Sequence, residues 1–295
     1  MLREFAPAKI NLYLHITGRQ PDGYHILDSL AAFAGVGDEV RLEPATQFDF
    51  IIEGPQSGTL AEEPLEGNLV VRAARAFALD TGKPLDMRLT LIKNLPVASG
   101  IGGGSSDAAA VLRLLAAHWG IGLRDQRLLK AAALCGQDVP VCLDPRSCYI
   151  AAEGVEDGPE LPHCDIVLVN PGKSLSTAFV YKAFKDSAAS FSAIRRLESA
   201  PSDAAELAAM LKIRHNDLAA PALRLMPEIV DVLKALENEG DCLFARMSGS
   251  GATCFGLFPN RDSARRAASA LFAAHPTWWV VPTYMPLLCD QRRSF

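Results

Sequence analysis

The stretch Pro96-Val-Ala-Ser-Gly-Ile-Gly-Gly-Gly-Ser-Ser-Asp-Ala-Ala-Ala-Val-Leu-Arg-Leu-Leu115 carries the strongest structural signal in this chain. Its four glycines, at positions 100, 102, 103 and 104, allow positive φ and leave no Cβ in the way, so the backbone there can fold around a ligand with its N–H groups exposed. Ser105, Ser106 and Asp107 are typical of a helix cap and first turn, and the apolar residues after them predict a helix that ends at Gly120. Because unpaired N–H groups and the helix dipole both favour negative charge, we expect an anion site at this loop.

The chain does not fit the signatures of two other phosphate-binding loops. The dinucleotide fingerprint needs a glycine at its sixth position, where a start at Gly100 gives Ser105 and a start at Gly102 gives Asp107. The other P-loop signature finds its tail in Gly172-Lys173-Ser174, but Val167 stands where its first glycine is required. A simple glycine turn before a capped helix remains the alternative to phosphate binding.

The size and composition of the chain are those of an ordinary globular protein. Its 295 residues suit two domains, which we place at 1–155 and 156–295, and 49% of the residues are hydrophobic against 21% charged. A formal net charge of −5 argues against a broad nucleic-acid or anionic-membrane surface. We therefore expect small-molecule partners, no nucleic acid and no membrane, and leave monomer or homodimer open.

The seven cysteines include no Cys-x-x-Cys pair and no nearby histidine at zinc-type spacing, so we predict reduced, mostly buried thiols and no metal site built by the protein. The first residues lack the apolar core and small-residue cleavage site of a signal peptide, and no apolar run is long enough to span a membrane. These features predict a cytoplasmic protein.

Strand-like and helix-like segments alternate through the first half of the chain. Residues Ala8 to Thr17 alternate apolar and polar side chains, which predicts a strand with Lys9 and Asn11 together on its polar face; a solvated face is the default interpretation. Tyr24 and His25 follow a turn and are able to stack on and bond a flat base, although such a pair more often packs its own loop. Further elements are expected at Val36 to Glu43, Phe48 to Glu53, Asn68 to Gly82 (a helix), Met87 to Ile92 and Asp125 to Cys135 (a helix), with Asp138 at the exit of that last helix.

The second half begins after Gly154 to Pro162, whose glycine, proline and acidic residues predict a linker. A glycine-rich turn, Met247 to Phe258, is expected to join two strands. The other expected elements are a strand at Asp165 to Asn170, a helix capped by Ser176-Thr177, partly helical structure over residues 186 to 211, and helices at Met226 to Leu236 and Ser263 to Ala273. This alternation predicts an α+β or α/β protein of two layers.

Three separated segments resemble the three motifs of the GHMP kinases, in their usual order. They are Ala6-Pro-Ala-Lys-Ile-Asn-Leu12, Gly100-Ile-Gly-Gly-Gly-Ser-Ser-Asp-Ala108 and Ser248-Gly-Ser-Gly-Ala252. Gly18-Arg-Gln-Pro-Asp-Gly-Tyr-His25, Gly136-Gln-Asp-Val-Pro140, Pro171-Gly-Lys-Ser-Leu-Ser-Thr177 and Asn216-Asp-Leu218 are similar to the branch that phosphorylates the 2-hydroxyl of a cytidine diphosphate methylerythritol. The resemblance implies a two-domain α+β fold, a ribosomal protein S5 domain 2-like N-terminal domain and an α/β-sandwich C-terminal domain, with the active site in the cleft between them.

The resemblance also implies roles for individual residues, with ATP and Mg²⁺ as cofactors. Lys9 and Asp138 become the catalytic pair: Asp138 accepts the hydroxyl proton and Lys9 holds the oxygen. The residues implied for ATP, with Ser105 or Ser106 also close to Mg²⁺, are Asn68, Pro96, Val97, Ala98, Ser99, Gly100, Ile101, Gly102, Gly103, Gly104, Ser105 and Ser106. The residues implied for the substrate, with the two tyrosines around cytosine and His25 bonding its edge, are Asn11, Tyr24, His25, Thr177, Tyr181, Gly249 and Gly251.

Departures from the family pattern occur within the glycine loop. Val97-Ala98-Ser99 stands where more glycine is usual, so we expect the adenine side of the loop to be shaped differently. We interpret Asp107 as a helix cap that faces away from the phosphates. Two alternatives stay open: another small-molecule kinase of the superfamily, acting on homoserine, mevalonate or a sugar, and a nucleotide-binding regulator without catalysis.

Overall fold

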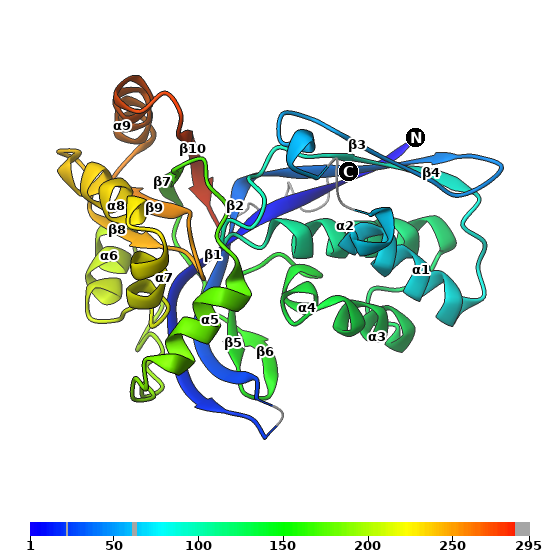
Figure 1. Cartoon of the computed structure of the whole chain (residues 1–295), viewed down its shortest axis with the longest axis horizontal. Coiled ribbons are helices and arrows are strands. Elements are labelled where there is room, and N and C mark those ends of the chain that lie inside the picture. Colours follow the sequence, from blue (N-terminus) through cyan, green and yellow to red (C-terminus); the bar gives the residue numbers. More distant parts are fainter. Residues whose placement is uncertain (22, 61–63, 287–295) are drawn as a thin grey trace.

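The computed structural model describes residues 1–21, 23–60 and 64–286. Asp22 of the turn before Tyr24, and Cys289, lie outside the described residues. Figure 1 shows two lobes joined by a pair of long strands that run between them. The predicted α+β class is confirmed.

The first sheet is built around the antiparallel strands β1 (Leu2–Arg19) and β2 (His25–Pro44). Two further antiparallel strands pair with different halves of β2: β4 (Met87–Ile92) with its end and β5 (Cys148–Ala151) with its beginning. The sheet is completed by β3 (Asp49–Glu53), parallel to β4, and by β6 (Gly154–Asp157), antiparallel to β5. The linker predicted at Gly154 to Pro162 is therefore wrong at its start, because pairing with β5 outweighs a composition typical of loops.

The polar face predicted for the first strand is present, but it is not solvated. Lys9, Asn11 and His15 are 3%, 2% and 1% exposed. Alternation identifies two faces, yet only the fold shows what covers the polar one. Asp138 and Gly102 of the first lobe cover Lys9, while Gly249 and His215 of the second lobe lie against Asn11 and His15. The burial of these groups requires hydrogen-bond or charge partners, and it makes them candidates for function.

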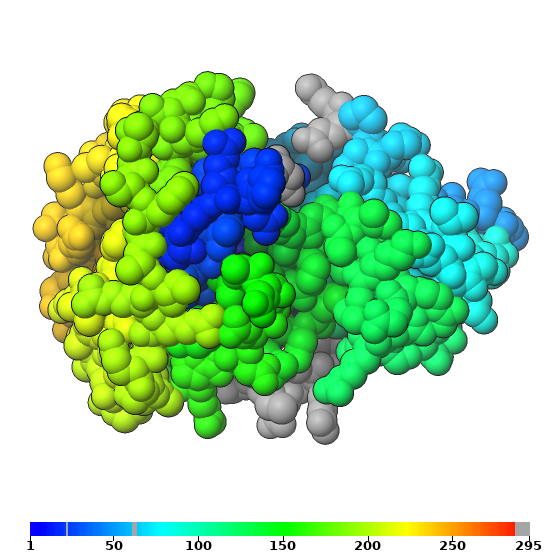
Figure 2. All heavy atoms as spheres, turned by 90° about the horizontal axis from the view of Figure 1, so that it is seen from below, coloured from blue at the N-terminus to red at the C-terminus, as the bar shows by residue number. Residues whose placement is uncertain are grey.

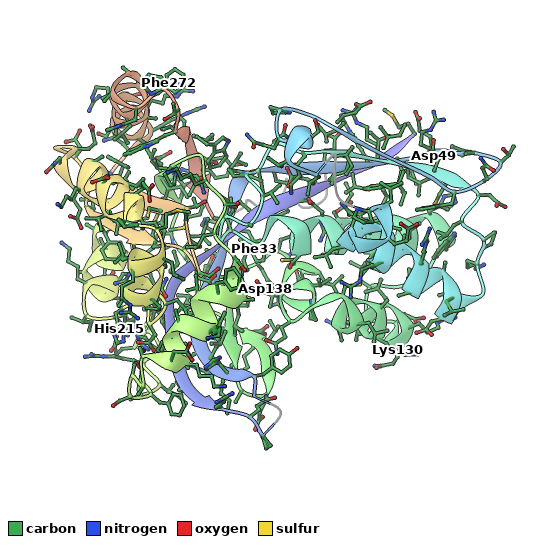
Figure 3. The ribbon with its side chains drawn as sticks, in the orientation of Figure 1. Phe33, Asp49, Lys130, Asp138, His215 and Phe272 are labelled. Atoms are coloured by element: carbon green, nitrogen blue, oxygen red, sulfur yellow. The ribbon has the colours of Figure 1, made fainter. Side chains whose placement is uncertain are left out.

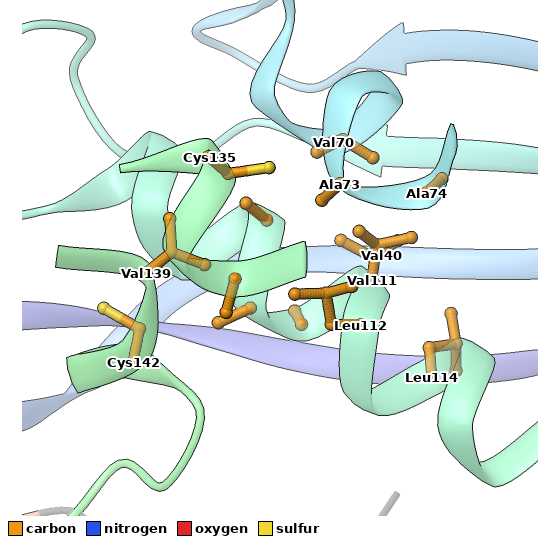
Figure 4. Packing of buried hydrophobic residues seen from close by; sticks show 14 of the residues in the cluster. Val40, Val70, Ala73, Ala74, Val111, Leu112, Leu114, Cys135, Val139 and Cys142 are labelled. Atoms are coloured by element: carbon orange, nitrogen blue, oxygen red, sulfur yellow. The ribbon is translucent and has the colours of Figure 1, made fainter. Parts of the chain in front are cut away.

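Four helices cover one face of the first sheet: α1 (Leu69–Thr81), α2 (Gly103–Trp119), α3 (Gln126–Cys135) and the short α4 (Asp138–Cys142). Two single 3₁₀ turns, Ser57–Leu60 and Leu65–Gly67, precede α1. The Asn68 side chain caps α1 by accepting from the Val70 N–H, and Gly82 ends it in the left-handed conformation. Figure 4 shows the apolar packing of this layer, with Val111 and Leu112 of α2 close to Val40 of β2.

The start of α2 and the existence of α4 differ from the sequence prediction. Gly102, with φ of +63°, takes the N-cap position of α2, so Ser105 and Ser106 lie within the helix instead of capping it. Asp138 was expected in a turn, but it opens α4, whose five residues are too few for a periodic signal.

The second sheet is antiparallel, in the order β10 (Trp279–Met285), β7 (Cys164–Asn170), β9 (Cys254–Phe258) and β8 (Phe244–Met247). The helices of this lobe are α5 (Thr177–Asp186), α6 (Ala204–Lys212), α7 (Ala219–Leu225), α8 (Glu228–Asn238) and α9 (Arg261–Ala274). The inner side chains of β1 complete this core: Ile10 and Leu12 share a buried cluster with Ile166 and Phe255. The lobes are thus joined by a common core, and the domain boundary expected between residues 155 and 156 stays a prediction.

Among the described residues, no helix has the length and apolar character needed to cross a bilayer.

Candidate active site

A cavity of about 1350 Å³ lies between the lobes and gathers most of the residues expected at the site. Its lining includes Lys9, Asn11, Tyr24, His25, Asn68, Pro96, Val97, Ala98, Ser99, Gly100, Gly102, Gly103, Gly104, Ser105, Asp138, Thr177, Tyr181 and Gly249. In Figure 2 the surface is hollowed beside the tip of β1 and β2 (blue), between the green helical layer and the yellow-green second lobe.

Three of the expected residues lie behind this lining. Ile101 and Ser106 are fully buried, and Gly251 packs against its own lobe, where an added Cβ would meet the Met247 Sδ at 2.7 Å. None of the three is part of the cavity lining in this structure.

Lys9 and Asp138 meet on the cavity wall. The Lys9 Nζ donates to the Asp138 Oδ2 at 2.8 Å; the lysine side chain is 4% exposed and the carboxylate is 42% exposed. Burial disfavours the ammonium, but the Asp138 carboxylate outweighs it, and the pKa of Lys9 lies above its ordinary value. Figure 3 places Asp138 near the centre of the molecule, between the two lobes. The pair can therefore present one fixed positive charge and one accessible proton acceptor to the same bound group.

The glycine loop is held by neighbouring segments through its carbonyl groups. Three backbone carbonyls of the loop, those of Ala98, Ser99 and Ile101, accept hydrogen bonds at 2.9 to 3.0 Å. Their donors are the backbone N–H groups of Leu175, Thr253 and Lys9, respectively. The carbonyls thus point into the protein. The first N–H groups of α2 have no partners within the helix, and Gly103, Gly104 and Ser105 line the cavity, so this wall suits an anion.

The turn formed by the third motif, Ser248 to Ala252, which we call the third glycine turn, packs tightly against the glycine loop. The Ser248 Oγ donates to the Gly100 carbonyl at 3.0 Å, and the Gly100 φ is +75°. A Cβ at Gly100 would lie 2.5 Å from both the Gly251 N and the Ser248 O. Only glycine fits this contact, which ties the loop of the first lobe to the second lobe.

The far end of the cavity is aromatic. The ring of His25 stacks on Tyr181, with centroids 5.2 Å apart and planes 28° apart, while Tyr24 is 58% exposed. Burial and the charges of Arg19 and Lys185 lower the pKa of His25. A neutral imidazole is therefore favoured in a locally positive environment.

Sequence reasoning missed four positively charged side chains that line the cavity, because no periodic pattern marks such residues in advance. They are Arg19, Arg72, Lys182 and Lys185. Lys93 also lines it; this side chain follows β4 directly, on the way into the glycine loop, which is the one signal that could have identified it.

Lys93 also corrects the interpretation of Asp107. The Asp107 carboxylate is buried and accepts from the Lys93 Nζ at 2.7 Å, and Lys93 donates to Asp38 as well. Burial raises the pKa of Asp107 despite the attraction of Lys93, and the nearby Asp38 raises it further. Asp107 is therefore part of a buried charge cluster beneath the start of α2, and the expected cap role was wrong.

Two family models match the chain: the GHMP kinases N terminal domain over residues 68–144 and the GHMP kinases C terminal domain over residues 190–277. The chain is 48% identical over 298 residues to a 4-diphosphocytidyl-2-C-methyl-D-erythritol kinase of Cereibacter sphaeroides strain ATCC 17025, covering 97% of this chain and 99% of the relative. It is 45% identical over 282 residues to the same-named kinase of Paramagnetospirillum magneticum, covering 95% and 97%.

Solved structures agree with these matches. A crystal structure of 4-(cytidine 5'-diphospho)-2C-methyl-D-erythritol kinase superposes with a TM-score of 0.75 at 33% identity, over 96% of this chain and 99% of the other. A crystal structure of L. major mevalonate kinase in complex with R-mevalonate has a TM-score of 0.69 at 15% identity, over 97% of this chain and 96% of the other, and shows a likeness of fold alone. The predicted two-part fold is confirmed over nearly the whole chain.

Proposed function

Because the chain belongs to the 4-diphosphocytidyl-2-C-methyl-D-erythritol kinases of the GHMP family, we propose that it transfers the γ-phosphoryl group of ATP to the 2-hydroxyl of 4-diphosphocytidyl-2-C-methyl-D-erythritol, in non-mevalonate isoprenoid precursor biosynthesis. The products are the 2-phosphate and ADP. The observation that carries the proposal is the Lys9 and Asp138 pair, joined at 2.8 Å in the cavity that the glycine loop also lines.

In this proposal Asp138 is the general base. Its carboxylate is accessible from the cavity, and its second oxygen is available to accept the proton of the substrate hydroxyl. Lys9, held charged by its partner, stabilises the oxygen as it becomes the nucleophile. Phosphoryl transfer needs little covalent work from the protein, so positioning and electrostatics account for most of the catalysis.

ATP is assigned to the glycine-loop side of the cavity. The phosphates lie against the start of α2, where Gly103, Gly104 and Ser105 offer backbone N–H groups, and Asn68 lines the same side. The buried Lys93 lies beneath Gly103, where a Cβ would be 3.1 Å from its Nζ, but its charge is already matched by the carboxylates of Asp38 and Asp107.

The residues of this wall also fit Mg²⁺. This ion prefers oxygen ligands and is commonly held by a few protein groups together with substrate phosphates and water. The Ser105 hydroxyl lines the cavity, and the buried Ser106 Oγ has no hydrogen-bond partner among the described residues. When bound, the ion would neutralise charge on the transferred phosphoryl group, with Ser105 or Ser106 as a protein ligand.

The cytidine diphosphate end of the substrate is assigned to the aromatic end. Cytosine stacks between Tyr24 and Tyr181, which requires the His25 ring to leave its stack on Tyr181 and bond the edge of the base. Arg19 and Lys185 face the diphosphate. Thr177, whose hydroxyl is 2.8 Å from the Ser250 Oγ, adds a polar contact, and Asn11, Gly249 and Gly251 are assigned to the methylerythritol end, with Gly251 acting from behind the wall.

ADP release from Mg-ATP tests the proposal, with 4-diphosphocytidyl-2-C-methyl-D-erythritol beside homoserine, mevalonate and galactose. Turnover is expected with the cytidine compound alone. Turnover with a different alcohol would refute the substrate, and binding of ATP without turnover of any of the four would favour a non-catalytic regulator.

We also infer a cytoplasmic location. The described cysteines are all free and five of the six are buried, which is typical of a reducing compartment.

A further inference from the structure

Ser29 of β2 lies behind the wall of the cavity and contacts Asn11 on the neighbouring strand. Ser29 is fully buried, and its Oγ donates to the Tyr13 carbonyl at 2.5 Å. The same oxygen accepts from the Asn11 Nδ2 at 2.8 Å. The pairing of β1 with β2 shifts register between Asn11 and Tyr13, the two residues that share this hydroxyl.

The donor inventory fixes the direction of both bonds. A serine hydroxyl has one hydrogen, and a carbonyl oxygen can only accept, so that hydrogen belongs to the Tyr13 carbonyl. Ser29 therefore has only lone pairs left for Asn11. The amide of Asn11 must turn its nitrogen toward Ser29, because the opposite orientation would bring two acceptors together inside the protein.

This orientation determines what Asn11 offers to the cavity. Its Oδ1 lies 3.2 Å from the position of a Cβ on Gly249, and both residues line the cavity. Asn11 is also two residues from Lys9 on the same strand. An acceptor oxygen is thus held beside the catalytic pair.

We propose that Ser29 is a positioning residue that fixes the Asn11 amide with its oxygen toward the bound alcohol, so that Asn11 accepts a hydrogen bond from a substrate hydroxyl. The proposal rests on the proposed function for the identity of the alcohol, but not for the orientation of the amide. Ser29 is fully buried and does not line the cavity, so its effect on a bound molecule passes through Asn11.

A double-mutant cycle on kcat/KM tests the coupling. Ser29→Ala is expected to lower kcat/KM for the cytidine substrate by roughly 2-fold to 12-fold, the range of one net hydrogen bond, with the KM for ATP unchanged. Ser29→Thr keeps the hydroxyl and should restore most of the loss. In an Asn11→Ala background, Ser29→Ala should have no further effect.

Three results would overturn the proposal. Ser29→Ala could have the same effect on kcat/KM in the parent and in the Asn11→Ala background, or it could raise the KM for ATP as much as it lowers kcat/KM for the cytidine substrate. The third is an Asn11→Ala variant whose kcat/KM is unchanged. A second measurement does not depend on turnover. The side-chain amide signals of Asn11 in ¹⁵N-labelled protein without ligand should shift and exchange faster with water in Ser29→Ala than in Ser29→Thr. Identical signals in the two variants would refute the orientation even if the chain phosphorylated none of the alcohols tested.

Discussion

Replacing Asp138 by Asn keeps the shape of the side chain and removes its charge, and the effect on stability should differ sharply from that of replacing Lys9 by Met. Lys9 is 4% exposed and Asp138 is 42% exposed. Asp138→Asn leaves a buried ammonium without a counter-charge, which is costly. Lys9→Met leaves a carboxylate that water can reach.

The geometry sets the scale of this difference. Two unit charges 2.8 Å apart attract by about 6 kcal/mol at an effective dielectric constant of about 20. Water at the exposed carboxylate screens much of that attraction, so we expect Asp138→Asn to lower the free energy of unfolding by about 1 to 3 kcal/mol. Lys9→Met should lower it by less than about 1 kcal/mol, because methionine fills the buried path of the lysine stem.

Urea unfolding of the two single variants and the double variant measures these values. The cost of Asp138→Asn should disappear in the Lys9→Met background. Without the carboxylate, burial should bring the pKa of Lys9 below its ordinary value of 10.5, so the cost should be largest near neutral pH and shrink as the pH rises toward that value. Equal costs for the two single variants, or additive costs in the double variant, would refute this account of the pair. Both variants should lower turnover by roughly two to four orders of magnitude, with ATP binding near normal in Asp138→Asn.

Other perturbations test the remaining parts of the site. Tyr24→Ala should raise the KM for the cytidine substrate by roughly tenfold with little change in stability, as expected for one stacked base; an unchanged KM would remove Tyr24 from the site. Gly100→Ala should destabilise the fold by about 2 kcal/mol or more because of its positive φ and backbone contacts, whereas Gly104→Ala, whose Cβ would meet only the Leu69 Cδ1 at 3.5 Å, should not; equal urea midpoints would contradict the contact. Burial and the charges of Arg19 and Lys185 lower the pKa of His25 below its ordinary value of 6.5. The contribution of His25 to stability should therefore be complete above pH 6.5 and lost as the pH falls from there through the lower pKa of the folded state. If a His25→Gln variant lost the same stability in acid, another group would be responsible.

Elements with local signals were predicted well. The strand at Met87–Ile92 has the predicted bounds, and the helix between Asn68 and Gly82 is capped by those two residues. Alternation, caps and helix-ending glycines depend on near neighbours, so the sequence alone contains them. The glycine loop was likewise placed correctly between a strand and a helix.

Features that depend on distant contacts were not predictable from local patterns. The polar face of β1 is buried by residues far away in the sequence, Asp138 at Lys9 and His215 at His15. The role of Asp107 is decided by Lys93, 14 residues earlier in the chain. The cavity combines segments from β1 to the third glycine turn, and only the family resemblance brought Lys9 and Asp138 together in advance. Lys93 and Ser29 were missed because a lone buried lysine or serine leaves no periodic signal.

The shared core of the two lobes has a consequence for the synthesis of the chain. β1 leaves the ribosome long before the second lobe, yet its apolar face packs against Ile166 and Phe255, and the Asn11 N–H donates to the Ser248 Oγ, 237 positions later in the chain. The nascent chain must therefore carry an uncovered apolar strand until most of the protein has been made. The strand that carries Lys9 is thus exposed to aggregation during translation, and a truncated product ending before β9 would retain that exposure.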